Sequence, residues 1–287
     1  MYFVAGASGR VGSVVARELL AANQPVTVLL RDARDAVGWE RRGARVRLGT
    51  LQDAASLASS LAGAKAAFLL QPPSYAEPDF LGRQLALAQS VEQALRESAV
   101  PHVVLLSSVG AHLASGTGPI QGLHGLEAAI RRSGTTLSAF RACYFQENVR
   151  NALGPARSAG IFPVLAPGPE QSFPQISCLD VSRFIALAMQ TARPPAHEVV
   201  DLVGPTYSHA QVASALGRAL GKELRATPLP RAAWVPALQK SGLSAEMAGL
   251  LAEMNDAHAK GWLVGTGDRT LQGTTPIEVT IDHIISG

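Results

Sequence analysis

The sequence predicts a doubly wound α/β fold, in which helices cover both faces of a mostly parallel sheet, together with a second, smaller mixed domain. Three observations predict it. Short apolar runs alternate with helical patterns through the first half of the chain. These runs, such as Val103 to Leu106, are continuous rather than alternating in polarity, as expected for strands buried on both faces. A glycine-rich turn lies between the first run and the first helical pattern, where such folds bind ligands.

The predicted elements of the first half follow one another in a regular order. Strands are predicted at residues 2–5, 26–30, 44–48, 66–70, 102–107 and 136–140. Helices are predicted at residues 9–22, 54–61, 80–98 and 123–132, with an Arg-rich helical or irregular segment after the second strand. Repeated strand–helix units indicate parallel strands joined by crossover helices.

The second half has a different texture after about Arg150. Prolines at positions 155, 163, 167, 169 and 174, and again at 228, 230 and 236, break it into loops and short elements. A strand at residues 198–203 and a helix at residues 209–220, ending at Gly221, are predicted within it. We therefore expect two domains, residues 1–150 and 151–287, with some elements of the second returning to the main sheet.

The composition excludes several classes of protein. With 47% hydrophobic and 16% charged residues, the chain is not of the disordered type. No run approaches the roughly 20 apolar residues of a membrane span, and no basic segment precedes the first apolar residues, so neither a membrane nor a secretory role is expected. Two cysteines, Cys143 and Cys178, lack metal-ligand spacing and fit a reducing, cytoplasmic location.

The net charge of +3 is distributed unevenly. Arginines cluster after the second strand, at positions 31, 34, 41, 42, 45 and 47. This cluster is either a solvated surface or an anion-facing patch for a phosphorylated cofactor. Aromatic residues are not interleaved with it and no nucleic-acid motif accompanies it, so a nucleic-acid partner is not predicted.

The most informative motif is the turn Gly6-Ala7-Ser8-Gly9-Arg10-Val11-Gly12, which follows the first strand and opens the first helix. One glycine permits the tight turn, another lets the backbone approach a pyrophosphate, and a third lets the helix pack against the strand. The N–H groups of the helix N-terminus then hold phosphate oxygens. The motif predicts that Gly6, Ser8, Gly9, Arg10, Val11 and Gly12 bind a dinucleotide; for Arg10, a solvated first-turn position is the alternative.

The end of the second strand predicts the type of dinucleotide. An acidic residue there binds the ribose hydroxyls of NAD, whereas an arginine suits the 2′-phosphate of NADP. Arg31 follows the strand directly, and a guanidinium can bind phosphate in a bidentate manner. Asp32 comes next and is either a competing NAD signal or a helix cap. The sequence favours NADPH over NADH.

Several segments together resemble the NmrA-like branch of atypical short-chain dehydrogenases. The turn has the spacing Gly-x-x-Gly-x-x-Gly that this branch uses. The other matching segments are residues 49–53 with 56–57, 67–73, 133–137, 140–141, 145–148 (Phe-Gln-Glu-Asn), 203–205 and 221. They cover the chain up to about residue 225. Thr50 departs from the pattern, because the family often has Asp there, which weakens any expected contact of this position with adenine.

The resemblance implies a fold and a range of functions. It implies an NAD(P)-binding Rossmann domain at residues 1–150 and a smaller substrate-side domain at residues 151–287. Some members of the family reduce quinones, azo dyes or triphenylmethane dyes with NAD(P)H. Others, such as NmrA itself, bind the dinucleotide as sensors without known chemistry.

The catalytic Tyr–Lys pair of standard short-chain dehydrogenases is missing. In such a pair, four residues apart, the lysine lowers the pKa of the tyrosine so that the phenol can transfer a proton. Tyr75, Tyr144 and Tyr207 are followed at that offset by Asp, Asn and Gln. Alcohol–ketone interconversion is therefore disfavoured. A quinone, being a strong hydride acceptor, needs little help from a positioned acid.

The remaining candidates follow strand ends, where the ligand crevice of such a sheet lies. His124 is the predicted catalytic residue, as proton donor or pocket residue, with a surface histidine as the alternative. Besides the turn and Arg31, the predicted cofactor contacts are Leu70, Gln71, Pro72 and Ser107. The predicted substrate contacts are Ser108, Tyr144, Phe145 and Asn148. For the serines strand-end capping is the alternative, and for Tyr144 a place in the core.

Two functions follow from these residues. The first is an NADPH-dependent oxidoreductase that passes hydride to a quinone-like or dye-like small-molecule acceptor. The alternative is an NAD(P)-binding redox sensor without catalysis, which would need a protein partner. A sugar-nucleotide epimerase or dehydratase is less favoured, because those reactions rely on the missing tyrosine. No metal-ligand set and no Gly-x-Ser-x-Gly elbow of a hydrolase is present in the sequence.

Overall fold

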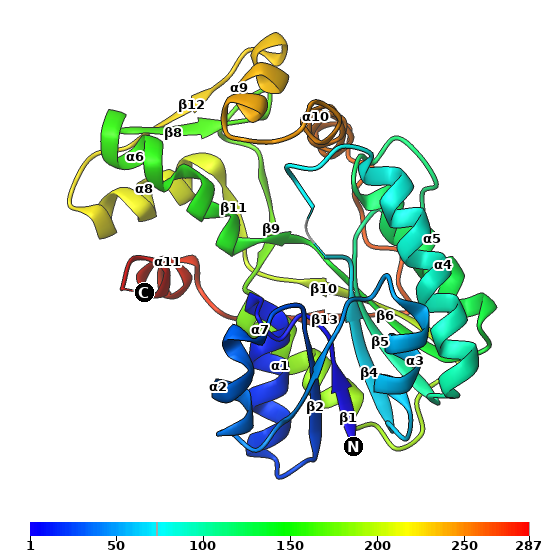
Figure 1. Ribbon diagram of the computed structural model, residues 1–287. Helices are drawn as coiled ribbons and strands as arrows, with labels where there is room; N and C mark the ends of the chain where they lie inside the picture. Colours follow the sequence, from blue (N-terminus) through cyan, green and yellow to red (C-terminus); the bar gives the residue numbers. More distant parts are fainter. Residues whose placement is uncertain (73, 287) are drawn as a thin grey trace.

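A computed structural model of the chain describes residues 1–72 and 74–286 (Figure 1). Pro73, at the end of the family-like segment 67–73, lies outside the described residues. A large sheet with helices on both faces makes up the lower part of Figure 1, and a smaller part lies beyond the carboxyl ends of its strands. In the described ranges no helix combines the length and the apolar character that crossing a membrane requires.

The large sheet is parallel throughout and has the strand order β13-β10-β6-β5-β4-β1-β2-β3. Its strands are β1 (Tyr2–Val4), β2 (Val26–Leu30), β3 (Arg45–Leu48), β4 (Ala66–Leu70), β5 (His102–Ser108), β6 (Thr136–Ala142), β10 (His197–Val203) and β13 (Arg269–Gln272). The chain runs outward from β1 to β3 and then returns to the other side of β1. This reversal between β1 and β4 is the switch point of a doubly wound sheet, and it confirms the predicted fold class.

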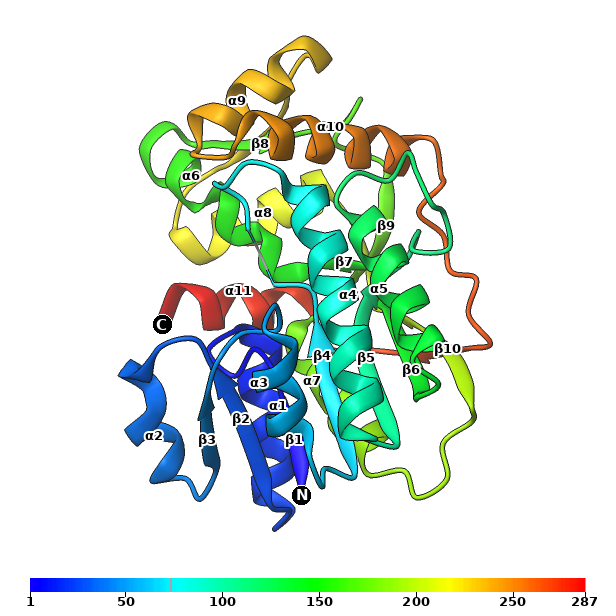
Figure 2. The same cartoon turned by 45° about the vertical axis from the view of Figure 1, so that its right-hand side comes forward.

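Helices cover the two faces of the sheet as separate layers (Figures 1 and 2). One layer holds α1 (Arg10–Ala21), α2 (Ala36–Glu40) and α7 (Cys178–Met189), and the other holds α3 (Ala54–Leu61), α4 (Phe80–Ser98) and α5 (Ile120–Arg132). Alternate residues of β1 point to opposite layers, Tyr2 and Val4 to the first and Phe3 and Ala5 to the second. The strand is therefore apolar at every position.

The smaller part is built from two short sheets and five helices. Its strands are β7 (Tyr144–Phe145), β9 (Ser172–Ile176) and β11 (Thr206–Ser208) in one sheet, and β8 (Ile161–Val164) and β12 (Arg225–Pro228) in the other. Its helices are α6 (Leu153–Ala159), α8 (His209–Leu220), α9 (Trp234–Lys240), α10 (Ala245–Ala259) and α11 (Ile277–Ser286). Short 3₁₀ turns are η1 (Ala33–Asp35), η2 (Gln146–Ala152) and η3 (Arg231–Ala233). Phe162, Leu216 and Ile281 lie in its separate apolar core.

The predicted elements of the first half are confirmed, and β2, α3, β4 and α4 match at both ends. Helix α8 also matches, and it ends at Gly221 with φ +67°. Helix α5 begins at Ile120 rather than at residue 123, because Pro119, its N-cap residue, already has helical φ and ψ. Two later strands, β10 and β13, return to the main sheet. Helices α6, α7, α9, α10 and α11 were not predicted.

Candidate functional site

The glycine turn joins β1 to α1 at the switch point of the sheet. Gly6 has φ +67°, and a Cβ there would lie 2.7 Å from Leu70 Cδ2. A Cβ at Gly12 would lie 2.4 Å from the carbonyl oxygen of Gly6, so only glycine lets α1 come this close to β1. Gly9 caps α1 without a side-chain hydrogen bond. The turn therefore presents the first N–H groups of α1 and the positive end of its dipole to an anion.

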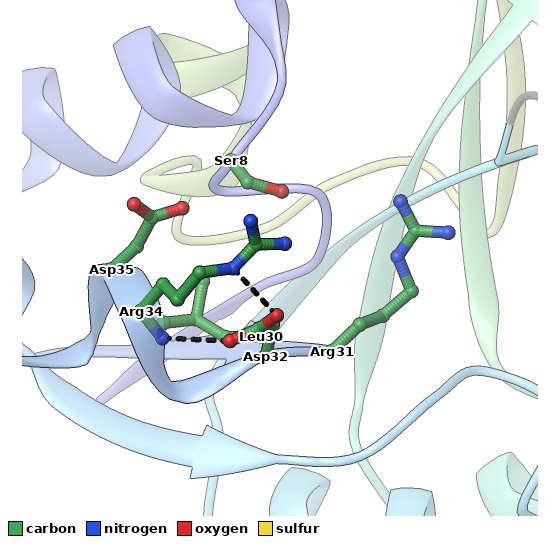
Figure 3. Close-up of a pocket in the computed structure, with 6 residues that line it drawn as sticks. All are labelled: Ser8, Leu30, Arg31, Asp32, Arg34 and Asp35. Carbon is green, nitrogen blue, oxygen red and sulfur yellow. Dashed lines mark hydrogen bonds and ion pairs between the residues drawn. The ribbon is translucent and has the colours of Figure 1, made fainter.

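A cavity of about 510 Å³ lies beside this turn (Figure 3). Its lining residues come from the turn and from the end of β2: Ser8, Leu30, Arg31, Asp32, Arg34 and Asp35. The side chain of Arg34 points toward Ser8, whereas that of Arg31 extends away from Arg34. The side chains of Arg31 and Arg34 thus both line the cavity between the glycine turn and the end of β2.

Asp32, which the sequence leaves open between a ribose contact and a cap, is a cap in the structure. Its side chain caps η1 by accepting the backbone N–H of Arg34 at 2.8 Å. Its second carboxylate oxygen accepts a hydrogen bond from Nε of Arg34 at 2.7 Å. Both oxygens are therefore bound to Arg34, while the side chain of Asp32 remains 51% exposed.

Helix α7 packs against α1, and its N-terminus is already capped by a side chain. Glu147, a buried residue, accepts the backbone N–H of Cys178 at 2.8 and 3.0 Å and the hydroxyl of Ser177 at 3.3 Å. Burial, and next the charge of Glu147, raise the pKa of the Cys178 thiol, and the charge of Arg10 opposes them. Glu147 thus occupies the anion position at the N-terminus of α7, whereas the N-cap residue of α1, Gly9, makes no side-chain cap.

The two serines at the end of β5 have different surroundings. The hydroxyl of Ser107 is buried and donates to Glu127 of α5 at 2.6 Å. Arg141 of β6 binds the same carboxylate through Nε at 2.9 Å and Nη2 at 2.7 Å, and its Nη1 donates to Thr266 at 3.0 Å. Ser108 is half-buried and donates to the carbonyl of Val109 at 3.0 Å. Ser108 is thus the more accessible serine of the pair.

His124 and Gln71 lie close to the segments that follow β4 and β5. His124, half-buried on α5, has its Nδ1 at 2.9 Å from the carbonyl oxygen of Ala111. A carbonyl only accepts, so Nδ1 carries a hydrogen and Nε2 is the atom free to act on a ligand. Gln71 donates to the carbonyl of Pro119 at 3.3 Å, while its Oε1 is buried without a partner among the described residues. Pro72, next along the chain, is half-buried.

Tyr144 belongs to a cluster of rings beyond the end of β6. Its ring meets the ring of Phe173 edge to face, with the ring centroids 5.3 Å apart. The ring of Phe173 also packs on those of His209 and His258, at centroid distances of 5.1 and 4.6 Å. Burial raises the pKa of the Tyr144 phenol, and a hydrogen bond with Asn148 opposes the shift. Phe145 packs on the core between the sheet and α1. Tyr144 and Asn148 therefore lie together beyond the carboxyl ends of the parallel strands, the edge of the sheet at which the glycine turn also lies.

The family model of the NmrA-like family matches residues 2–280. The chain belongs to the NmrA-like family. An NAD(P)H azoreductase from Xenophilus azovorans is 26% identical over 272 residues, which are 93% of this chain and 91% of that protein.

Two solved structures share the fold of this NmrA-like protein. An NADPH-dependent quinone oxidoreductase from Escherichia coli, solved with NADPH, superposes with a TM-score of 0.81 at 22% identity and covers 99% of this chain and 100% of its own. The triphenylmethane reductase of Citrobacter superposes with a TM-score of 0.80 at 18% identity and covers 100% of this chain and 99% of its own.

The predicted residues of this NmrA-like protein fall into two groups. The turn, with Arg10 and Arg31, lies at the ends of β1 and β2, and the predicted catalytic and acceptor-side residues lie beyond β4, β5 and β6. Sequence reasoning missed Arg34 as an individual candidate, although it was part of the arginine cluster. It also missed Phe173, His209 and His258, which are far from Tyr144 in the sequence and reach it only through the small sheet β11-β9-β7.

Proposed function

We propose that this protein is a reductase that uses NADPH in preference to NADH and passes hydride to a quinone-like or dye-like acceptor. The observation that carries the proposal is the glycine turn, with the open N-terminus of α1 on one side and the arginine-lined cavity on the other. The azoreductase, quinone reductase and triphenylmethane reductase to which the chain is similar support the same chemistry.

The residues present fit a dinucleotide phosphate. Only glycine is accommodated at position 12, and the N–H groups of residues 10–12 would hold the pyrophosphate, with the exposed side chain of Arg10 beside them. Arg34 and Arg31 would bind the 2′-phosphate, since Asp32 is turned back onto Arg34. When bound, the nicotinamide supplies the hydride.

The acceptor side would be served by residues beyond β4, β5 and β6. Ser108, Tyr144 and Asn148 offer a hydroxyl, a phenol and an amide that can orient a carbonyl or azo group, and Phe145 lies next to them. We assign His124 to proton transfer: since its Nδ1–H is held by Ala111, only a protonated imidazole delivers a proton from Nε2. Leu70, Gln71 and Pro72 would flank the nicotinamide ribose. The buried Ser107 would belong to the cofactor site through its place near the end of β5.

A titration with both nucleotides followed by a panel of acceptors tests the proposal. We expect NADPH to bind more tightly than NADH, and NADPH to be oxidised rapidly in the presence of a simple quinone. A protein that binds NADPH but turns over no quinone or dye would contradict the reductase assignment.

A sensor without catalysis is the second candidate, and two observations favour it. Ser107, the buried serine next to the end of β5, donates its hydroxyl to the buried carboxylate of Glu127 and not toward a ligand. In addition, no lysine stands four residues after a tyrosine, so the proton-transfer pair of standard short-chain dehydrogenases is missing. A sensor would bind the nucleotide without turnover and retain a partner protein in only one redox state. Absence of such a partner with both NADP⁺ and NADPH would argue against it.

A further inference from the structure

Helix α10 lies across the N-terminal end of α4, although the two helices are far apart in the sequence (Figures 1 and 2). The carboxylate of Glu246, in the first turn of α10, accepts the backbone N–H of Phe80 at 2.7 Å and that of Leu81 at 3.3 Å. These two N–H groups belong to the first turn of α4. A side chain from one helix thus caps another helix across 166 residues of sequence.

Helix α4 needs this cap, because its own N-cap residue does not supply one. Asp79 has the left-handed conformation, with φ 56° and ψ 50°, and its side chain makes no capping hydrogen bond. The Glu246 carboxylate takes that place and brings a negative charge to the positive end of the α4 dipole.

Two other kinds of contact fasten this end of α10. Phe80, Met247 and Leu250 form an apolar cluster separate from the larger cores, and Leu81, Leu243 and Leu251 pack against it. The backbone N–H of Ser244 donates to the carbonyl of Tyr75 at 2.9 Å. The carboxylate of Glu246 thus supplies the charged contact beside an apolar one where α10 meets the start of α4.

The rest of α10 and the residues after it cross the segment that follows β5. A Cβ at Gly118 would lie 2.0 Å from the carbonyl oxygen of Leu250, and one at Gly110 would lie 2.6 Å from Leu263 Cδ2. Helix α10 then reaches the end of β6, where His258 packs on Phe173 and Phe173 packs on Tyr144. It therefore crosses the α4 start after β4, the segment after β5 and the residues after β6.

We propose that α10 covers the acceptor side of the crevice and that Glu246 is the positioning residue that fastens this cover to α4. The inference rests on the proposed function, because it takes the ends of β5 and β6, next to the nicotinamide ribose at the end of β4, as the place of the acceptor. The phosphate-binding residues lie at β1 and β2, away from α10. Loosening the cover is therefore expected to change the KM for the acceptor more than the Kd of NADPH.

A graded pair of variants, Glu246→Ala and Glu246→Gln, tests the proposal. Alanine removes both hydrogen bonds, whereas glutamine keeps an acceptor oxygen but loses the charge. Hydrogen exchange at the N–H groups of Phe80 and Leu81 is expected to quicken about tenfold in Glu246→Ala and less in Glu246→Gln. The KM for a small quinone is expected to rise about threefold or more in the same order, with a change in the Kd of NADPH of less than about twofold.

The matched control is Glu278→Gln, which removes an exposed ion pair between Glu278 and Arg218 on the far side of the smaller part. It is expected to behave as the wild type in every measurement. Unchanged exchange at Phe80 and Leu81 in Glu246→Ala would overturn the role of Glu246. Faster exchange with an unchanged KM for the acceptor would overturn the role of α10 as a cover. If the wild type itself reduces no acceptor, it is the proposed function that fails, and the cover falls with it.

Discussion

At the scale of single residues, our proposal makes Arg34 the residue that distinguishes NADPH from NADH. Arg34 points toward Ser8 over the cavity. Its Nε is paired with Asp32, but the side chain is 86% exposed, so its two terminal guanidinium nitrogens are accessible to a ligand. We expect Arg34→Ala to weaken NADPH about tenfold or more, since a charge-assisted bond to phosphate is lost, and to change NADH by less than about twofold. Calorimetric titration with both nucleotides measures the difference.

Two further variants sharpen this measurement. Arg31→Ala is also expected to weaken NADPH more than NADH, by less than Arg34→Ala, because Arg31 extends away from Arg34. Arg45→Ala removes an exposed arginine of the same sequence cluster that does not line the cavity, and it is expected to bind both nucleotides as the wild type does. Equal losses for NADPH and NADH in Arg34→Ala would remove Arg34 from the phosphate site.

Gly12 carries the second prediction at this scale. A Cβ there would meet the carbonyl oxygens of Gly6 and Ala5 at 2.4 and 2.6 Å, and backbone atoms cannot move aside as a flexible side chain can. Gly12→Ala is expected to lower the free energy of unfolding by about 1–3 kcal/mol and to abolish tight binding of NADPH. Urea denaturation and calorimetry check the two effects separately.

Gly125 offers the matched control for Gly12. It lies within α5, and a Cβ there would meet no atom within 4 Å. Gly125→Ala is expected to leave binding intact and to stabilise the fold by about 0.5–1 kcal/mol, because alanine favours the helix. A Gly12→Ala protein as stable and as tightly binding as the wild type would show that α1 can move away from β1.

At the scale of elements, one buried ion pair ties β5, α5 and β6 together. The side chains of Glu127 and Arg141 are 2% and 6% exposed, and Ser107 completes the site. Arg141→Ala leaves the carboxylate without its bidentate partner, and we expect a loss of about 3–5 kcal/mol in the free energy of unfolding. Urea denaturation measures it. Arg269→Ala, which breaks a half-exposed pair with Glu198, is expected to cost only about 0–1 kcal/mol. A loss at Arg141 as small as this would contradict the assigned role of the pair.

The elements also show how far the sequence alone could predict the molecule. Strand β4 and helix α4 were predicted to the residue, because their lengths decide between strand and helix: the apolar run of β4 has 5 residues and the amphipathic pattern of α4 has 19. Glu246 could not be found in this way, because the partner of its carboxylate is a backbone N–H group that any residue has. Asp32 could be narrowed to two roles, and that it caps η1 through the backbone N–H of Arg34 became visible only in the structure.

At the scale of the whole molecule, segments far apart in the sequence lie beyond the carboxyl ends of the strands of the large sheet. The turn and Arg34 come from the chain's first 35 residues, Tyr144 from the middle, and His258 from near the end. His209, at the start of α8, and His258, near the end of α10, both pack on Phe173. These two histidines therefore join α8 and α10 to β9, and their protonation bears on the stability of the entire fold.

Stability should accordingly fall in mild acid. Burial, followed by the charge of His258, lowers the pKa of His209 from 6.5 to about 4. Below pH 6.5 the unfolded chain binds a proton that the folded protein refuses until about pH 4, so the free energy of unfolding decreases as the pH falls through this window, by roughly 2 kcal/mol between pH 7 and pH 5. In urea denaturation at the two pH values, His209→Asn is expected to lose much of this decrease. His283→Asn, a change of an exposed histidine on α11, is expected to keep it. An equally steep decrease in His209→Asn would mean that His209 is not the group that resists protonation in the folded state.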